Sequence, residues 1–357
     1  MKDTSNIVNF YLEVNKLKQN YDSFNKIGQI YYPLKTNSNI VVIKEINRLY
    51  NGSDNGFLIT HECHYNKLKQ IGITADKICV ANVLMSDIDI HYLYNQGVRY
   101  FTFDNINSLK EFLRYANPNE IRIAIRLNII EVFNVFSHLG ALTKNCKEMF
   151  DLLKENNVKN FGISFYLQKE TVPAGNVLNR MLDYIKDNFN TYSMSFINIG
   201  GAIKPEEIDI SKLNEVKEIL NANKLIIEPG RYLVGNAGYM ETEIIKKTLK
   251  NTFIIKNGIY SGLLDCRLYN KNFELYLNDN SRLIKLEYKP FKESKEVIFC
   301  GASSDSGDRI GKLYIDDDNY NKLKVGSIIK VENALAYVEE FFMPLGGDFR
   351  IKYNIMK

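Results

Sequence analysis

The chain has 357 residues, 45% of them hydrophobic and 25% charged, and its 46 basic and 42 acidic residues give a formal net charge of +4. This length exceeds one average domain, so the composition predicts two globular domains, each with its own hydrophobic core. The small and evenly spread charge argues against nucleic acid as a partner, and no apolar run approaches the length needed to cross a membrane.

Eight short apolar segments follow one another between residues 29 and 230, and most are too short for globular helices. Their continuous apolar character is typical of parallel strands that are buried on both faces. Amphipathic stretches with helical spacing separate them, so the order predicts a (β/α)8 TIM barrel, which we place at residues 25–235. The predicted strands are Ile30–Leu34, Gly56–Thr60, Lys77–Ala81, Arg99–Phe103, Arg122–Asn128, Gly162–Leu167, Phe196–Gly201 and Leu225–Pro229.

The sequence after about Gly235 loses helical periodicity and breaks into short apolar or alternating segments divided by Asn, Asp and Gly. Such segments predict an antiparallel β-barrel or β-sandwich domain, which we place at residues 236–357 together with residues 1–24. For residues 1–24 the pattern leaves open a strand or a helix. The predicted strands are Thr242–Ile245, Thr252–Lys256, Phe273–Leu277, Arg282–Tyr288, Val297–Cys300 and Ser327–Glu332.

Polar residues at the ends of the predicted barrel strands are the first candidates for a functional site, because TIM barrels carry their chemistry there. Lys35 ends the first strand, and its amine is able to form a Schiff base once burial helps it to lose its proton. Glu228 follows the eighth strand, where a carboxylate is suited to bond the ring nitrogen of a cofactor. Gly200, Gly201 and Arg231 offer backbone N–H groups and a guanidinium to a phosphate. These are the groups that hold pyridoxal phosphate.

A resemblance to a known family rests on seven segments: Pro33–Ser38, Ser137–Gly140, Gly162–Tyr166, Asn198–Ala202, Glu228–Arg231, Cys300–Asp308 and Leu335–Tyr337. Through them the chain resembles the fold-type III pyridoxal-phosphate decarboxylases, which include ornithine, lysine and diaminopimelate decarboxylases. Glu228–Arg231 matches the family motif without change, and Asn198–Ala202 matches Asp-Ile-Gly-Gly-Gly with two changes. The resemblance covers nearly the whole chain. It implies removal of the α-carboxylate of an amino acid, or of a biosynthetic intermediate derived from one, through a Schiff base and a quinonoid.

The same resemblance implies how the cofactor is held. Lys35 corresponds to the Schiff-base lysine, and Glu228 to the carboxylate that keeps the pyridine nitrogen protonated. Tyr166 replaces the family's ring-stacking histidine and keeps an aromatic plane at this position. The phosphate is expected to contact Gly200, Gly201, Arg231 and Tyr337.

A loop of the second domain enters the active site of the partner subunit in this family, so the resemblance implies a homodimer with shared active sites. In this loop, Asp305 and Asp308 are expected to position an amino-acid-like substrate. Ser304 stands in the place of the family's catalytic cysteine and is the candidate proton donor, although a hydroxyl is a much weaker acid than a thiol.

Two further residues are candidates for substrate binding. Arg267 lies near Asn270, which replaces the acid that holds the distal amine in the ornithine enzymes, and this change favours a substrate with a distal carboxylate. His138 occupies the place of the lysine in the family's Ser-Lys-Phe-Gly segment.

Two other functions stay open. A racemase or epimerase of the same fold places an arginine at the pyridine nitrogen, whereas Glu228 favours decarboxylation. A regulatory protein that has lost catalysis fits the changes at Tyr166 and Ser304, although the retained Lys35 argues against it.

Two remaining patterns concern metal and location. His61-Glu62-Cys63-His64 invites a zinc interpretation, but its histidines are three residues apart rather than the four of a metalloprotease helix. We therefore expect it to begin the second barrel helix and predict no metal site. Five cysteines without a pairing pattern, and an amino terminus without an apolar signal segment, predict a reduced, cytoplasmic protein.

Overall fold

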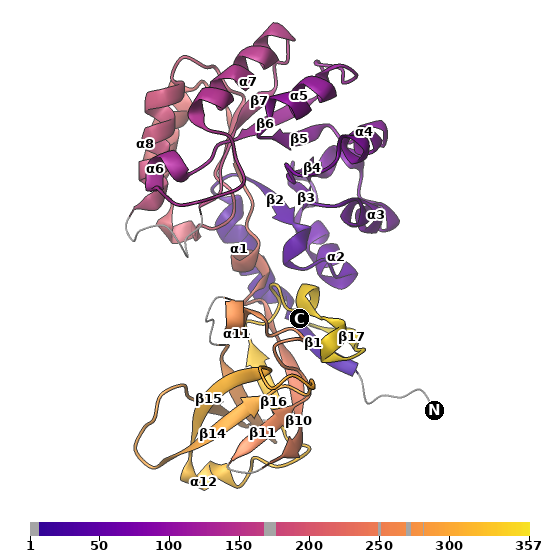
Figure 1. Cartoon of the computed structure of the whole chain (residues 1–357), viewed down its shortest axis with the longest axis vertical. Helices are drawn as coiled ribbons and strands as arrows, with labels where there is room; N and C mark the ends of the chain where they lie inside the picture. The colour runs from indigo at the N-terminus through magenta and orange to yellow at the C-terminus, as the bar shows by residue number, and fades with distance from the viewer. Residues whose placement is uncertain (1–6, 168–175, 249–250, 269–272, 281) are drawn as a thin grey trace. The chain divides into compact units, whose positions relative to one another are not determined.

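The computed structural model describes residues 7–167, 176–248, 251–268, 273–280 and 282–357 (Figure 1). The chain divides into two compact units. One contains Tyr21–Ile40 and Ile46–Gly230, and the other contains Met1–Asn20, Val41–Glu45 and Arg231–Lys357. Within the described ranges, no helix is both long enough and apolar enough to cross a membrane.

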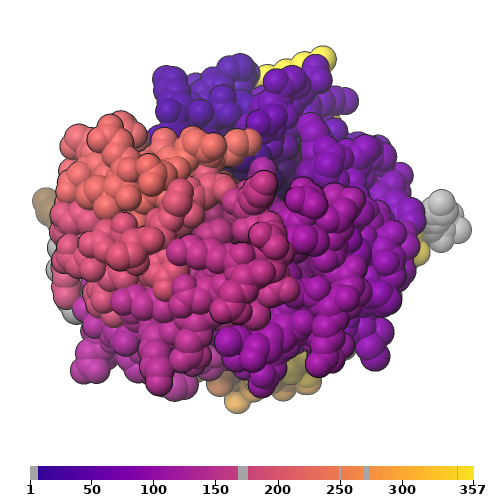
Figure 2. Space-filling view, turned by 90° about the horizontal axis from the view of Figure 1, so that it is seen from above, coloured from indigo at the N-terminus to yellow at the C-terminus, as the bar shows by residue number. Residues whose placement is uncertain are grey.

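The first unit contains a closed barrel of eight parallel strands, so all eight strands predicted from the sequence are confirmed. Each strand pairs with the next, and the first pairs with the last through Gln29↔Ile226 and Ile30↔Ile227. In the view from above of Figure 2, the colours run in chain order around the barrel, from indigo through magenta to salmon, and the salmon part lies next to the indigo part. The strands are β2 (Gln29–Pro33), β3 (Gly56–Ile59), β4 (Ile78–Val80), β5 (Tyr100–Phe103), β6 (Arg122–Arg126), β7 (Phe161–Ser164), β8 (Phe196–Asn198) and β9 (Lys224–Ile227).

Helices alternate with these strands because each linking segment carries an apolar stripe that the barrel buries. In the longest of these stripes the buried residues are Val177, Leu178, Met181, Leu182, Ile185 and Phe189. The helix α3 begins at Glu62, directly after His61. It is the second helix that follows a barrel strand, as predicted. The helices up to β9 are α1 (Val14–Asn25), α2 (Ile40–Leu49), α3 (Glu62–Gln70), α4 (Asp87–Asn95), α5 (Ile106–Leu113), α6 (Ile130–Phe133), α7 (Thr143–Glu155), α8 (Val177–Phe189) and α9 (Ile210–Ile219), with short 3-10 turns η1 (Leu34–Thr36), η2 (Ala75–Lys77) and η3 (Pro205–Glu207).

The barrel interior is filled by side chains from different strands: Tyr31, Leu58, Cys79, Tyr100, Ala124, Phe196 and Ile226. At this level of the barrel, β7 carries Gly162. A Cβ on this residue would lie 2.1 Å from the carbonyl oxygen of Phe196 and 2.7 Å from its ring, so no larger residue fits there without a shift. The ring of Phe196 packs edge-on against Tyr100, with the centroids 5.5 Å apart. A small residue on β7 therefore makes room for a large one on β8, which is how close packing is reached.

We expect Phe196→Ala to destabilise the barrel by about 3–5 kcal/mol, because the side chain is 1% exposed and its removal leaves a cavity among packed rings. Urea denaturation followed by circular dichroism measures this change. Phe136→Ala is the matched control: its ring is 78% exposed, and truncation should alter the free energy of unfolding by less than about 0.5 kcal/mol. Equal losses in the two variants would contradict the packing described for the barrel interior.

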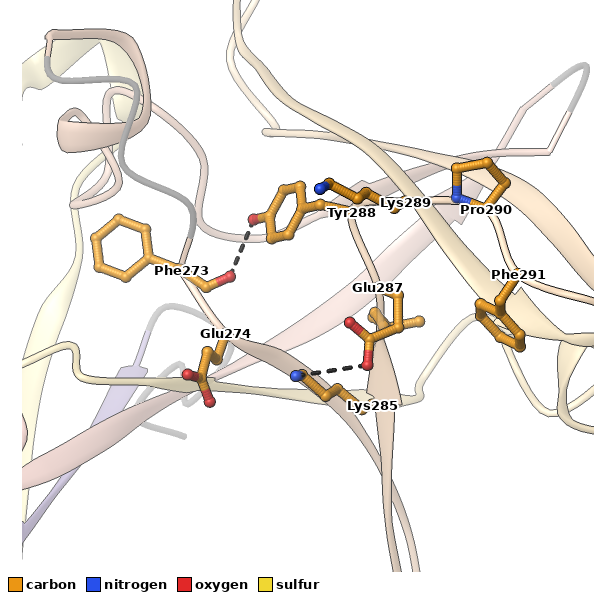
Figure 3. A pocket seen from close by; sticks show the side chains of 9 residues that line it. Phe273, Glu274, Lys285, Glu287, Tyr288, Lys289, Pro290 and Phe291 are labelled. Carbon is orange, nitrogen blue, oxygen red and sulfur yellow. Dashed lines mark hydrogen bonds and ion pairs between the residues drawn. The ribbon is translucent and has the colours of Figure 1, made fainter.

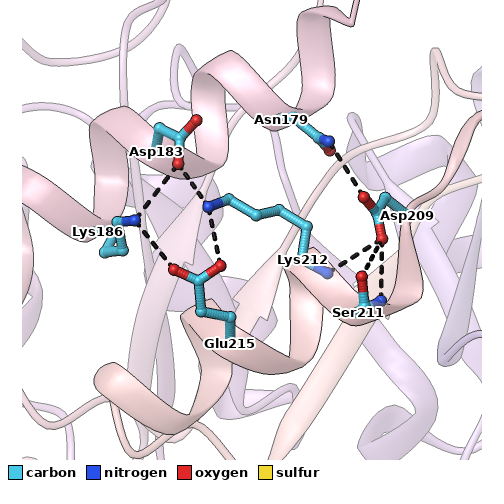
Figure 4. Close-up of polar contacts among 7 residues, drawn as sticks. All are labelled: Asn179, Asp183, Lys186, Asp209, Ser211, Lys212 and Glu215. Atoms are coloured by element: carbon cyan, nitrogen blue, oxygen red, sulfur yellow. Dashed lines mark hydrogen bonds and ion pairs between the residues drawn. The ribbon is translucent and has the colours of Figure 1, made fainter.

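A network of charged side chains joins α8 and α9 (Figure 4). Lys212 Nζ lies 2.6 Å from Asp183 Oδ1 and 2.9 Å from Glu215 Oε2. Lys186 Nζ closes the ring, 3.0 Å from Glu215 Oε1 and 3.5 Å from Asp183 Oδ1. The hydrogen bonds from Lys212 hold the pKa of Asp183 and that of Glu215 below their usual values.

Lys212→Met should lower the melting temperature at pH 7 by on the order of 1–2 °C. Because the pKa values of Asp183 and Glu215 are lowered by folding, their contribution is complete above the unfolded pKa values and is lost as the pH falls through the folded ones. The difference from wild type should therefore shrink below about pH 4. Lys292→Met, at a side chain that is 92% exposed, is the control. A difference that stays constant down to about pH 2 would argue against the network.

The second unit contains a mixed sheet, whose described strands follow the order β13-β12-β16-β10-β11-β14-β15, with β1 beside β10 and β17. Most neighbours are antiparallel, as predicted, but β1 pairs with β17 and β11 pairs with β14 in parallel. Parallel pairs join segments that are distant along the chain, so the local pattern could not reveal them. The strands are β1 (Ile7–Glu13), β10 (Gly238–Lys247), β11 (Thr252–Ile255), β12 (Leu275–Asp279), β13 (Arg282–Leu286), β14 (Ser294–Cys300), β15 (Arg309–Asp316), β16 (Ile328–Glu332) and β17 (Arg350–Met356), and the short helices are α10 (Arg231–Val234), α11 (Asp265–Leu268) and α12 (Asp317–Tyr320).

Candidate functional site

Lys35 lies at the carboxyl end of β2, in the 3-10 turn η1, between the buried residues Leu34 and Thr36. Its side chain is exposed to solvent, although neighbouring protein atoms partly desolvate the amine. This burial lowers the pKa of Lys35; the negative charge of Glu228 opposes the shift, and the positive charge of Arg126 adds to it. The lowered pKa increases the fraction of neutral, nucleophilic amine relative to a lysine in water.

Glu228 directly follows β9, and Asn198 at the end of β8 holds its carboxylate. The Asn198 amide nitrogen donates to Glu228 Oε1 at 2.6 Å, and the Asn198 amide oxygen accepts the N–H of Gly200 at 3.0 Å. Burial raises the pKa of Glu228, while the Asn198 hydrogen bond and the charges of Arg126 and Lys35 pull it back down. One amide thus connects the carboxylate with the turn after β8.

The glycines after β8 and β9 allow backbones to approach closely. Gly200 has a φ of +69°, a conformation that other residues adopt at a cost, and a Cβ on Gly201 would lie 1.9 Å from the Glu228 carbonyl oxygen. A Cβ on Gly230 would lie 2.3 Å from Thr36 Oγ1. Gly201 therefore lets the turn after β8 approach Glu228, and Gly230 lets the turn after β9 approach Thr36, which is next to Lys35.

Arg126 is a functional candidate that the sequence analysis missed. It is the last residue of β6, and burial lowers the pKa of its guanidinium, an effect opposed by the charges of Glu228, Asp104 and Tyr166. Asp104 follows β5 and accepts the N–H of Gly140 at 2.8 Å. The available signal was an arginine at the carboxyl end of a barrel strand whose three central residues are apolar, although the sequence pattern predicts Arg122–Asn128 only as a strand.

Two predicted residues lie on the connections that follow strands of this barrel. Tyr166 comes two residues after β7, is 39% exposed, and interacts electrostatically with Arg126. His138 is exposed on the connection between α6 and α7, where Asn128 donates to the carbonyls of neighbouring residues. The described interactions therefore group Tyr166 with Arg126 and Glu228, and they do not include His138 in this group.

Arg231 and Tyr337 are brought together in the second unit. Arg231 begins α10, and its guanidinium carbon lies 4.8 Å from the centroid of the Tyr337 ring. On its other side, Arg231 Nη1 donates to Asp265 Oδ2 at 2.6 Å. Sequence reasoning passed over Asp265, because a single acid at a helix start carries no signal of a distant partner.

The loop that follows β14 carries two aspartates, Asp305 and Asp308, which make different contacts. Asp305 accepts a hydrogen bond from the Tyr260 hydroxyl, and Arg267 Nη1 donates to the same hydroxyl oxygen at 3.1 Å. The Tyr260 hydrogen bond, the N–H of Gly307 and the charge of Arg267 lower the pKa of Asp305. Ser304 beside it is exposed.

Asp308, by contrast, is only 3% exposed and binds backbone. Its carboxylate accepts the N–H of Ile259 at 2.7 Å and that of Ser303 at 3.2 Å. A Cβ on Gly258 or Gly301 would lie 2.2 Å from this carboxylate, so two glycines make room for it. Asp308 thus fixes the loop that carries Ser304 and Asp305. Asn270, the other residue considered for substrate binding, lies outside the described residues.

The second unit also carries an open groove of about 620 Å³, whose lining includes none of the predicted site residues (Figure 3). In its lining, Lys285 Nζ lies 3.4 Å from Glu287 Oε1, and the Tyr288 hydroxyl donates to the carbonyl of Phe273 at 2.9 Å. In the described part of the chain, no group of three or more His, Cys, Asp or Glu side chains is arranged to hold a metal ion.

Solved structures share this architecture. A lysine/ornithine decarboxylase from Vibrio vulnificus, complexed with cadaverine, aligns with a TM-score of 0.80 at 18% identity and covers 98% of this chain and 94% of its own. The arginine decarboxylase of Paramecium bursaria Chlorella virus also aligns with a TM-score of 0.80, at 17% identity over 98% of this chain and 95% of its own. These likenesses confirm the two-part fold.

Relatives in sequence point in the same direction. Ornithine decarboxylase of Mus musculus is 22% identical over 342 residues, which cover 86% of this chain and 70% of that protein. Antizyme inhibitor 1 of Rattus norvegicus is 23% identical over 340 residues, or 87% of this chain and 74% of that protein. A family model described as "Pyridoxal-dependent decarboxylase, pyridoxal binding domain" matches residues 12–235, more than half of the chain and the whole of the described barrel. The motifs, the barrel and this match agree, and the chain belongs to the pyridoxal-dependent decarboxylases.

Proposed function

We propose that this chain is a pyridoxal-phosphate-dependent decarboxylase that removes the α-carboxylate of an amino acid or of an intermediate derived from one. The observation that carries the proposal is the pairing of a desolvated amine, Lys35, with a desolvated carboxylate, Glu228, at one end of the barrel. A barrel with a purely structural role has no need of two partly desolvated groups of opposite charge at the same end.

The residues fit the cofactor by their chemistry. Lys35 holds it through the neutral amine that burial favours, and Glu228 holds a proton on its ring nitrogen. Bound pyridoxal phosphate supplies an electron-accepting ring that stabilises the charge left on the α-carbon when CO2 departs. For this task Glu228 must be ionised, and Asn198, Arg126 and Lys35 all favour its ionised form.

The phosphate is held by charge and by backbone N–H groups. Arg231 supplies the guanidinium and Tyr337 supports it, since the two side chains are in contact. Gly200 and Gly201 supply N–H groups from the turn after β8, and Tyr166 covers the ring with an aromatic plane.

The substrate is held by the loop after β14, which acts on the partner subunit of a homodimer. Asp305 and Arg267 contact the distal group of the substrate, and Ser304, whose exposure supports this role, supplies the proton to the α-carbon. Asp308 acts through the loop, because backbone N–H groups occupy its carboxylate. His138, which belongs to the barrel unit, also contacts the substrate. The protein works in the cytoplasm.

A second candidate is a regulatory protein that binds the cofactor without decarboxylation. The similarity to antizyme inhibitor 1, a protein named for inhibition rather than for catalysis, supports it together with the serine at position 304. Racemisation is disfavoured, because Glu228 stabilises a protonated ring nitrogen where racemases of this fold place an arginine.

Purified protein should show the absorbance band of lysine-bound pyridoxal phosphate, and Lys35→Ala should lose it. Release of CO2 from carboxyl-labelled amino acids should fall by on the order of 10³-fold, which corresponds to about 4 kcal/mol of transition-state stabilisation. Lys44→Ala is the matched control, because Lys44 is an exposed lysine on α2 and should retain both signals.

The products separate the candidate functions. CO2 release supports the decarboxylase, inversion of the α-carbon without CO2 supports a racemase, and cofactor binding with neither product supports the regulatory protein. A colourless wild-type protein that takes up no pyridoxal phosphate would overturn all three.

The pH dependence of cofactor uptake tests the coupling between Lys35 and Glu228. Uptake by the apoprotein follows the neutral fraction of Lys35. The pH at which the uptake rate is half-maximal, its midpoint, should therefore lie below the ordinary lysine pKa of 10.5. Glu228→Gln removes the negative charge that favours the ammonium form, and the midpoint should move to still lower pH. Stopped-flow absorbance measures the rate. Glu206→Gln, at a side chain that is 71% exposed, is the control, and a midpoint that rises in Glu228→Gln would contradict the coupling.

A further inference from the structure

Asp265 is a buried carboxylate to which the proposed function assigns no task. Its side chain is only 1% exposed, and it lies at the start of the short helix α11. Its Oδ2 accepts a hydrogen bond from Arg231 Nη1 at 2.6 Å, whereas the Arg231 side chain is still 35% exposed. The acid is therefore inside the protein, and the arginine reaches from it towards solvent.

Tyr337 holds the same guanidinium from a second direction. Its ring centroid lies 4.8 Å from the guanidinium carbon of Arg231, and the ring stacks on Phe341 with the centroids 6.1 Å apart. Tyr337 has a φ of +58°, a left-handed conformation that is unfavourable for an L-residue and that the surrounding structure must maintain. A carboxylate and an aromatic plane together leave the guanidinium little freedom to turn.

This restriction matters because of how arginine binds a phosphate. The guanidinium carries five N–H donors in a rigid planar fork, and a bidentate contact requires the fork to face the anion. The bond to Asp265 uses one of these donors and sets the plane of the others. Without it, the long side chain must be ordered at the moment of binding, and this lost conformational freedom weakens the complex.

We propose that Asp265 is a positioning residue that holds Arg231 in the orientation required to bind the phosphate group of the cofactor. The proposal rests on the proposed function, and it adds an acid that does not itself touch the cofactor. Asp265 also brings a negative charge close to a phosphate site. Any benefit of Asp265 to phosphate binding must therefore come from orienting Arg231. A variant that loses only the charge should then bind the cofactor more tightly than a variant that also loses the hydrogen-bond acceptor.

Pyridoxal phosphate and pyridoxal, which share the aldehyde and the ring but differ in the phosphate, separate this role from a general effect on folding. With full-length apoprotein, Asp265→Ala should raise the Kd for pyridoxal phosphate about 10-fold, or about 1.4 kcal/mol, and change the Kd for pyridoxal less than about 2-fold. Asp265→Asn keeps an oxygen acceptor of the same size, so it should lose less affinity for pyridoxal phosphate than Asp265→Ala. Absorbance titration measures both constants.

Two further variants complete the test. In an Arg231→Ala background, Asp265→Ala should cause no additional loss of phosphate selectivity, because the residue acts through Arg231. Asp279→Ala is the matched control, since Asp279 pairs with Lys322 at 3.0 Å in the same unit and should leave both Kd values unchanged.

Three results would overturn the proposal while leaving the proposed function intact. These are an equal loss of affinity for both ligands in Asp265→Ala and Asp265→Asn, an unchanged Kd for pyridoxal phosphate in Asp265→Ala, and an additive loss in the Arg231→Ala background. A wild-type protein that binds neither ligand would overturn the proposed function itself.

Discussion

The pairing of β2 with β9 is the constraint on which the site depends. These strands are separated by nearly two hundred residues, and only closure of the barrel, through Gln29↔Ile226 and Ile30↔Ile227, makes them neighbours. Because both strands run in the same direction, their carboxyl ends meet at the same end of the barrel. The amine of Lys35 and the carboxylate of Glu228 consequently influence each other's ionisation, which neither residue could do in an unfolded chain.

The charges at this end of the barrel work as a balanced group. Burial alone lowers the pKa of Lys35 and raises the pKa of Glu228. Arg126 shifts both groups in the useful direction, because its positive charge favours the neutral amine and the ionised carboxylate. Asn198 adds a hydrogen bond to Glu228 without adding a second negative charge. A cofactor that needs a free amine and an ionised carboxylate side by side is well served by this arrangement.

In the second unit, acidic residues make hydrogen bonds to backbone and to side chains. Asp308 is buried against backbone N–H groups, whereas Asp305, three residues earlier, takes part in a contact with Tyr260 and Arg267 at the surface. Asp265 binds a side chain rather than backbone, and the arginine that it binds follows directly on the Glu228-Pro229-Gly230 segment. Burial separates these acids: Asp265 and Asp308 are buried against other groups of the protein, whereas Asp305 is only partly buried.

The sequence by itself determined the eight barrel strands and the family, and it singled out Lys35 and Glu228 as site candidates, because strand periodicity and short motifs are local properties. It also indicated a β domain, but not the parallel pairs β1·β17 and β11·β14, since pairing partners are distant along the chain. Only the tertiary structure revealed Arg126 and Asp265 and separated Asp308 from Asp305. In each case the deciding property is which charged group lies opposite another and how much water remains between them. Periodicity carries no information about either.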